Sequence, residues 1–96
     1  MALNFLDFDV SEDDDGLCSW SALAAPAPVH REALLAEVQA LLHALTQSLG
    51  PAGPLDEGHA WDMALDIQQG SDRTTVSLHL AGRQALAEQL THWTGA

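Results

Sequence analysis

Two runs in which apolar and polar residues alternate, one on each side of a short polar turn, restrict the possible folds most strongly. A period of two is typical of β-strands that bury one face. A two-residue turn at Gly70 and Ser71 predicts an antiparallel hairpin in which Gln69 faces Asp72. A slip by one residue would turn the apolar set towards solvent. The inner face of this register consists of four pairs: Ile67 with Thr74, Leu65 with Val76, Met63 with Leu78 and Trp61 with Leu80.

The N-terminal part predicts a second hairpin. Residues 3–10 alternate as a strand, with Leu6, Phe8 and Val10 on one face and Asp7 and Asp9 on the other. A solvated acidic turn follows. Residues 17–23 are compatible with a returning strand or with a helix. As a strand, this segment would face Cys18, Trp20 and Ala22 inward, and would pair Val10 with Cys18 and Phe8 with Trp20.

Two helices are predicted, over residues 29–49 and about 83–93. Apolar side chains recur at helical spacing on both, and Gly50 is suited to end the first helix. The expected fold is an α+β two-layer sandwich in the order β-β-α-β-β-α, a single domain over residues 1–96 whose two helices cover one face of a four-stranded antiparallel sheet. The expected core residues are Leu34, Val38, Leu41, Leu45 and Leu49, widened by Leu35 and Leu42, and then Leu86, Leu90 and Trp93. An alanine stripe at Ala33, Ala36, Ala40 and Ala44 is either a solvent face or a surface for a second helix.

Charge excludes several classes of function. The chain has 14 acidic residues, three arginines and no lysine, with a net charge of −11. Three cations cannot neutralise a run of phosphates, so nucleic acid and anionic membranes are not expected partners. An acidic surface instead favours a protein with a basic surface. The first ten residues lack the basic start of a secretory signal, and no apolar run reaches about 20 residues, so we expect a cytoplasmic protein.

The acidic turn does not form a calcium loop of the EF-hand type. Counting from Ser11, Asp13, Asp15 and Gly16 fall at suitable positions, but Ala22 stands where a bidentate glutamate is required. Weak, non-specific binding of a divalent cation by Asp13, Asp14 and Asp15 stays open beside the simpler interpretation of a solvated charge run. No metal or other cofactor is expected.

The predicted hairpin places Asp62 directly opposite His79, with Ser77 two residues away on the same strand. These are the residue types of a catalytic triad. Side chains two residues apart on a strand are about 7 Å apart, and no oxyanion hole is evident, so we expect a cross-strand pair and not an enzyme. The single cysteine, Cys18, cannot form an intramolecular disulfide and is expected to be a core residue.

Three segments carry a resemblance to known sequences: FLDFDVSEDDDG, GPLDEGHAWDMAL and TTVSLHLAG. They resemble a family of small uncharacterised bacterial proteins with an F-D-[YF]-S-E-D-x-x-G start, a G-x-L-D-x-G-x-x-W-D middle and an S-L-x-L-x-G end. Val10 stands where that pattern has an aromatic residue. The resemblance spans most of the chain and implies no catalytic residues.

The sequence therefore predicts a non-enzymatic module that docks a basic protein. Leu3 and Phe5 are expected on the outer sheet face, which is otherwise thinly covered (Ala60, Ala64, Thr75, Ser77) and could pair with a second copy. The alternative is a domain that responds to a small ligand or a divalent metal, with a pocket near Trp20 or Trp61. The predicted partner-binding residues are Asp7, Asp9, Glu12, Asp13, Asp14 and Asp15.

Overall fold

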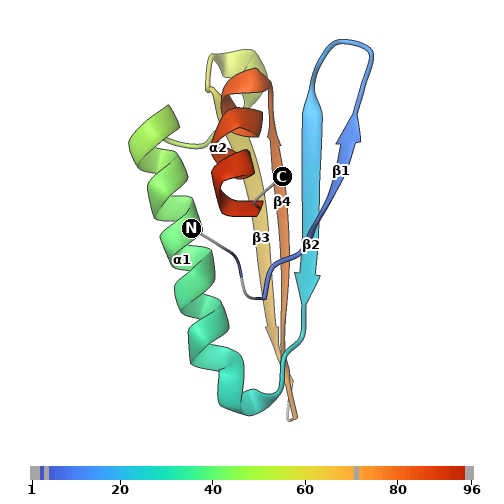
Figure 1. The fold of residues 1–96 in the computed structure, drawn as a ribbon, viewed down its shortest axis with the longest axis vertical. Helices are drawn as coiled ribbons and strands as arrows, with labels where there is room; N and C mark the ends of the chain where they lie inside the picture. The colour runs from blue at the N-terminus through green and yellow to red at the C-terminus, as the bar shows by residue number, and fades with distance from the viewer. Residues whose placement is uncertain (1–2, 4, 71, 95–96) are drawn as a thin grey trace.

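The computed structural model describes residue 3, residues 5–70 and residues 72–94. It is an α+β fold with a four-stranded antiparallel sheet and two helices, which confirms the predicted class (Figure 1). Two short 3₁₀ turns, Pro28–His30 and Leu55–Glu57, flank the long helix. The elements follow in the order β1 (Phe8–Glu12), β2 (Cys18–Ala24), α1 (Arg31–Leu49), β3 (Trp61–Gln69), β4 (Thr74–Gly82) and α2 (Gln84–Thr94).

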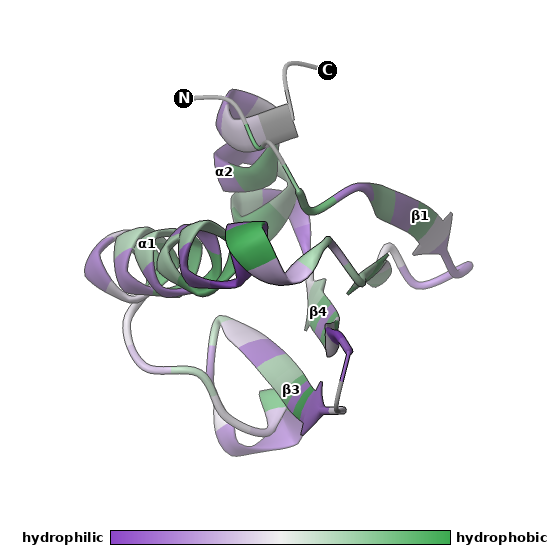
Figure 2. Cartoon of the chain, turned by 90° about the horizontal axis from the view of Figure 1, so that it is seen from below, coloured by the Kyte–Doolittle hydropathy of each residue, from purple (hydrophilic) through white to green (hydrophobic). Residues whose placement is uncertain are grey.

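The sheet order is β1-β2-β4-β3, so the two hairpins meet along β2 and β4 while β1 and β3 form the edges. Figures 1 and 2 show α1 and α2 on the same side of the sheet. Burial alternates along β4, because one set of its side chains faces these helices and the other faces away. Neither helix of the described residues covers the outer face of the sheet.

The core lies between the helices and the inner face of the sheet. Trp61 is 1% exposed, and its indole Nε1 donates a 2.8 Å hydrogen bond to the carbonyl of Gly50 at the end of α1. This bond ties the start of β3 to the helix terminus. The other fully buried large side chains come from α1, β4 and α2: Leu34, Val38, Leu41, Leu45, Val76, Leu78, Leu80, Leu86 and Leu90.

The predicted register of the β3–β4 hairpin is wrong by two residues. Gln69 faces Thr74, and Asp62 faces Ala81 instead of His79, which lies opposite Ala64. A two-residue shift keeps every side chain on its predicted face, so the alternation cannot distinguish the two registers. The pairing closes with a 2.9 Å bond from the Gly70 N–H to the Arg73 carbonyl. Ser71, half of the predicted turn, lies outside the described residues.

The first hairpin is shifted in the same way. Val10 faces Trp20 and Phe8 faces Ala22, in place of Cys18 and Trp20. The segment from Cys18 to Ala24 is a strand, which settles the choice between strand and helix. The shift moves the centre of the turn from Asp14 to Asp15, and strand pairing continues as far as Glu12 opposite Cys18.

The predicted strand over residues 3–10 is wrong in its first half, because β1 begins only at Phe8. Leu3 and Phe5 pack against the core and do not lie on the outer sheet face. The Glu37 carboxylate on α1 holds this segment, since its Oε2 accepts bonds of 2.8 Å from the N–H groups of both Phe5 and Leu6. A side chain from a distant helix therefore draws the N-terminal segment off the sheet.

The helices lie close to their predicted positions. Ala33, Ala36 and Ala40 of the alanine stripe are exposed in the single chain, whereas Ala44 packs partly against the core. Neither helix among the described residues is long and apolar enough to cross a bilayer.

Candidate functional site

The acidic turn between β1 and β2 is organised by the side chain of Asp13. Its Oδ1 accepts bonds of 2.9 Å from the backbone N–H groups of both Asp15 and Leu17. The Asp13 N–H donates to the Leu17 carbonyl at 3.0 Å, and Gly16 adopts a left-handed φ of +81°. This is a three-residue hairpin loop closed by a glycine, a geometry that residues with a β-carbon adopt at a cost.

The six predicted partner-binding residues therefore differ in what they do. Asp13 holds the loop together, and its carboxylate faces inward to the backbone. The other five carboxylates accept no resolved hydrogen bond from the described residues and are exposed: Asp7, Asp9, Glu12, Asp14 and Asp15. We call these five residues, together with Asp13, the acidic edge, since they follow β1 along one border of the sheet.

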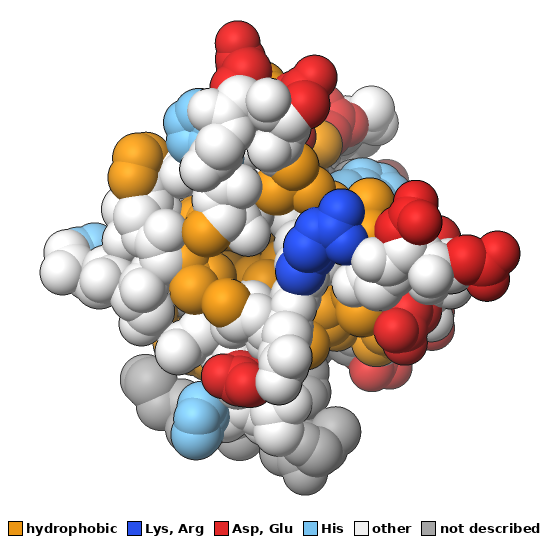
Figure 3. Space-filling view, turned by 90° about the horizontal axis from the view of Figure 1, so that it is seen from above, with side chains coloured by type: hydrophobic (Ala, Val, Ile, Leu, Met, Phe, Trp, Pro, Cys, Tyr) orange, Lys and Arg blue, Asp and Glu red, His pale blue; other side chains and the backbone are white. Residues whose placement is uncertain are grey.

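A hollow of about 510 Å³ lies at the same end of the molecule as the acidic turn. Arg83 links the two, because its Nη1 donates a 2.6 Å hydrogen bond to the carbonyl of Asp15. Figure 3 looks onto this end and shows apolar surface beside a cationic group, with acidic side chains gathered around it. We call this cavity the end hollow; it is lined by Leu17, Leu55, Asp56, His59, Ala60, Arg83 and Ala85.

The end hollow was not predicted from the sequence. Its lining comes from the acidic turn, the segment before β3 and the start of α2, which are distant along the chain. The apolar residues involved follow no periodic pattern, and so no local signal marks them.

Cys18 is paired with Glu12 across the first hairpin. Its side chain packs partly against the core, as predicted. Burial raises the pKa of the Cys18 thiol, and the nearby carboxylates of Glu12 and Asp13 raise it further. A raised pKa reduces the fraction of thiolate at neutral pH, so the environment does not activate this cysteine as a nucleophile.

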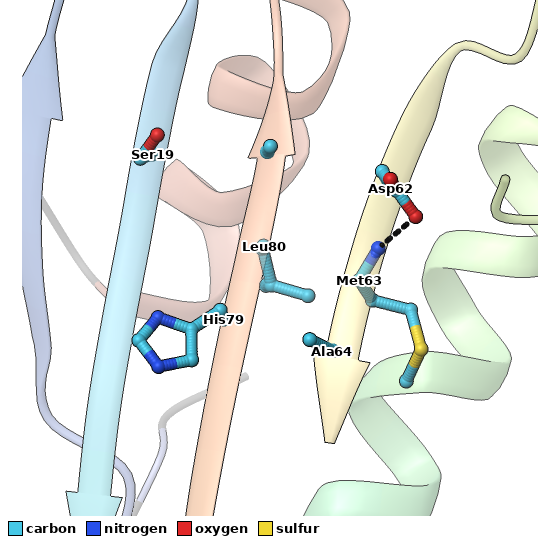
Figure 4. A pocket seen from close by; sticks show the side chains of 7 residues that line it. Ser19, Asp62, Met63, Ala64, His79 and Leu80 are labelled. Carbon is cyan, nitrogen blue, oxygen red and sulfur yellow. Dashed lines mark hydrogen bonds between the residues drawn. The ribbon is translucent and has the colours of Figure 1, made fainter. Parts of the chain in front are cut away.

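The outer face of the sheet centres on His79, but its partner is not the predicted one. Ser21 on β2 lies directly opposite His79, and its Oγ is 2.8 Å from the His79 Nδ1. Ser77 lies 3.5 Å from the Nε2. Asp62 instead accepts a 2.8 Å bond from the adjacent Met63 N–H, and Figure 4 shows its carboxylate turned to that backbone group. The predicted Asp62–His79 pair is therefore not formed.

This outer-face cluster lacks the features of a catalytic site. The hollow beside it has a volume of about 190 Å³, below the several hundred that small-molecule sites enclose. Its lining comes from neighbouring strands: Ser19, Asp62, Met63, Ala64, His79, Leu80 and Ala81. The strand N–H groups beside His79 are committed to the ladders on both sides of β4. They are not available as a pair of donors for a developing oxyanion.

The remaining candidates do not converge. Within the described part of the chain, no group of three or more histidine, cysteine or acidic side chains is arranged to hold a metal ion. His30 lies against the ring of Phe5 at 5.8 Å, and His59 lies 3.1 Å from the Pro54 carbonyl. The three tryptophans are all buried in the core and line neither hollow (Trp20, Trp61, Trp93).

No protein-family model, curated protein or solved structure matches the chain. The resemblance described above is therefore neither supported nor opposed by these comparisons.

Proposed function

We propose that this protein is a two-layer β-β-α-β-β-α module that docks a basic protein at the end bearing the acidic turn, without catalysing a reaction. The observation that carries the proposal is the end hollow, which supplies an apolar centre beside a rim of acidic side chains. Interfaces between proteins commonly have this arrangement, with apolar contacts at the centre and charged groups around them.

The apolar part of the hollow is suited to one side chain of a partner. Leu17 and Leu55 are half-buried, so each keeps surface that a partner could cover. A buried apolar or aromatic anchor commonly supplies most of the affinity of such a contact. We expect the partner segment to present one apolar residue with basic residues next to it.

The charges around the hollow favour a partner segment of positive charge. Asp56 belongs to the lining, Glu57 follows it, and Asp14 and Asp15 stand exposed on the neighbouring turn. Arg83 is the cationic side chain in the lining, and its bond to the Asp15 carbonyl directs it to the turn. Together with the net charge of −11, these acids attract a basic segment over distances comparable to the screening length.

The test is binding of synthetic basic peptides, each with one central leucine, phenylalanine or tryptophan, measured by fluorescence anisotropy at about 0.05 M and about 0.5 M salt. We expect the native chain to bind a subset of the peptides, and to bind them more weakly at the higher salt. Asp13 must be retained, since its removal would disturb the loop itself. The informative variant therefore combines Glu12→Gln, Asp14→Asn and Asp15→Asn.

A matched control changes the charge by the same amount elsewhere. Glu32→Gln, Asp66→Asn and Asp72→Asn alter three exposed acids away from the end hollow. We expect weaker binding in the acidic-turn variant than in this control. Ala85→Arg, which places a bulky cation in the hollow, is expected to abolish the preference for an apolar residue. Equal loss in both triple variants would show that only net charge matters, and would refute a docking site at this end.

A further inference from the structure

The two edges of the sheet differ in how they resist pairing with another chain. β1 is five residues long and is bordered by the acidic edge. β3 has nine residues, with acids only at Asp62 and Asp66. Leu65 and Ile67 on β3 keep 37% and 41% of their surface exposed, although they lie on the apolar face. Natural proteins protect sheet edges with charge or short length, so β3 is the less protected edge.

The backbone of β3 offers hydrogen-bonding groups at this edge. Hydrogen-bonded and non-bonded pairs alternate in an antiparallel ladder, and Gly70 forms a bonded pair with Arg73. It follows that the odd-numbered residues of β3 direct their N–H and carbonyl groups away from β4. Two of these groups have partners, since the Trp61 carbonyl accepts a 3.1 Å bond from Gly53 and the Met63 N–H donates to Asp62.

The outward groups of Leu65 and Ile67 have no partner among the described residues. They lie midway along the strand, next to the two exposed apolar side chains. This juxtaposition of unpaired backbone and apolar surface is what an added strand would cover.

We propose that β3 pairs with β3 of a second copy of this chain, antiparallel and centred on Leu65, so that the two sheets become one. A two-fold axis perpendicular to the sheet places the same surface on both sides of the contact and closes the assembly as a dimer. Leu65 then faces Leu65 of the second copy, and Met63 faces Ile67 on the apolar face.

The sequence of β3 selects this register over its neighbours. With Leu65 at the centre, Ala64 faces Asp66 and Asp62 faces Gln68, so that no two acids are directly opposed. Moving the centre to Ala64 would oppose Asp62 and Asp66. Moving it to Asp66 would oppose that residue with its own copy. Like charges directly opposite each other destabilise a sheet.

A second copy is the occupant favoured by this pattern, because in this register β3 covers its apolar side chains with the same apolar set and opposes none of its own acids. The net charge of −11 on each copy opposes association at long range. Salt screens this repulsion, so the dimer should become tighter as salt rises. Docking of a basic partner should weaken with salt, and the two interactions can therefore be distinguished.

Cysteine cross-linking tests both the dimer and its register. In a Cys18→Ser background, Leu65→Cys would place two thiols on residues whose Cα atoms lie about 5.5 Å apart, within reach of a disulfide. Ile67→Cys is the matched control, since it would be displaced from its own copy by roughly 13 Å. We expect covalent dimer from Leu65→Cys under mild oxidation, and about fivefold less or none from Ile67→Cys. Mixing Ile67→Cys with Met63→Cys should restore the cross-link.

Charge variants provide an independent measurement by sedimentation equilibrium. Ala64→Lys would face Asp66 of the second copy twice in the dimer and should tighten it by roughly two- to thirtyfold. Ala40→Lys on the exposed face of α1 makes the same change in net charge away from β3. A monomer at every concentration and salt, equal cross-linking at Leu65 and Ile67, or equal effects of the two lysines would each overturn the proposal.

Discussion

Replacing Asp13 by alanine should destabilise the fold, although the residue is exposed and lies in a run of like charges. The change removes two hydrogen bonds of 2.9 Å that the carboxylate accepts from the Asp15 and Leu17 N–H groups. Each bond contributes about 0.5–1 kcal/mol net in a solvated turn, so the loss is about 1–2 kcal/mol. Removing this carboxylate also relieves its repulsion with the neighbouring acids, which offsets only about a few tenths of 1 kcal/mol of the loss. For a chain of this size, the melting temperature should fall by roughly 5–15 °C.

The measurement is urea unfolding followed by tryptophan fluorescence, with Asp14→Ala as the control. Asp14 carries the same charge one position later but accepts no resolved bond, so its replacement should change the free energy of unfolding by less than about 0.5 kcal/mol. Asp13→Asn should retain most of the stability, because an amide oxygen can accept the same bonds. If Asp13→Ala and Asp14→Ala prove equally stable, the loop does not depend on this carboxylate and the reasoning is wrong.

Three further changes test the fold. Glu37→Ala removes the acceptor of two bonds from the N-terminal segment and should cost about 1–3 kcal/mol in chemical unfolding, with partial rescue by Glu37→Gln. Gly82→Ala would bring a β-carbon within 2.8 Å of the Cβ of the buried Leu86, and should lower the free energy of unfolding by about 1–3 kcal/mol in thermal denaturation. The Cys18 thiol should be alkylated with a midpoint above pH 9.0, and Glu12→Gln should lower this midpoint, whereas no change would exclude the charge contribution. The raised pKa favours the neutral thiol in the folded state, so its contribution to stability is present below pH 9.0 and is lost as the pH rises through the folded-state pKa.

The fold class and the local elements follow from the sequence with little ambiguity. The apolar spacing of residues 34–45 marks the inner face of α1, and Gly50 marks its end. Alternation assigns the side chains of β3 and β4 to their observed faces. The sequence predicts the candidate docking site only in part. It shows the acids, but not the hollow beside them or the hydrogen bonds by which Asp13 holds the loop.

The sequence by itself determined which face each strand residue occupies, because the side-chain period of a strand is two and only odd slips reverse it. It did not exclude a shift by an even number of residues, and both hairpins are paired two residues away from the register predicted from their apolar sets. The tertiary structure decided the rest. Pairing of β2 with β4 brings Ser21 to His79, and Glu37 on α1 draws Phe5 away from the sheet. These contacts join residues far apart in the chain, where no local pattern carries the information and the packing of whole elements selects the partner.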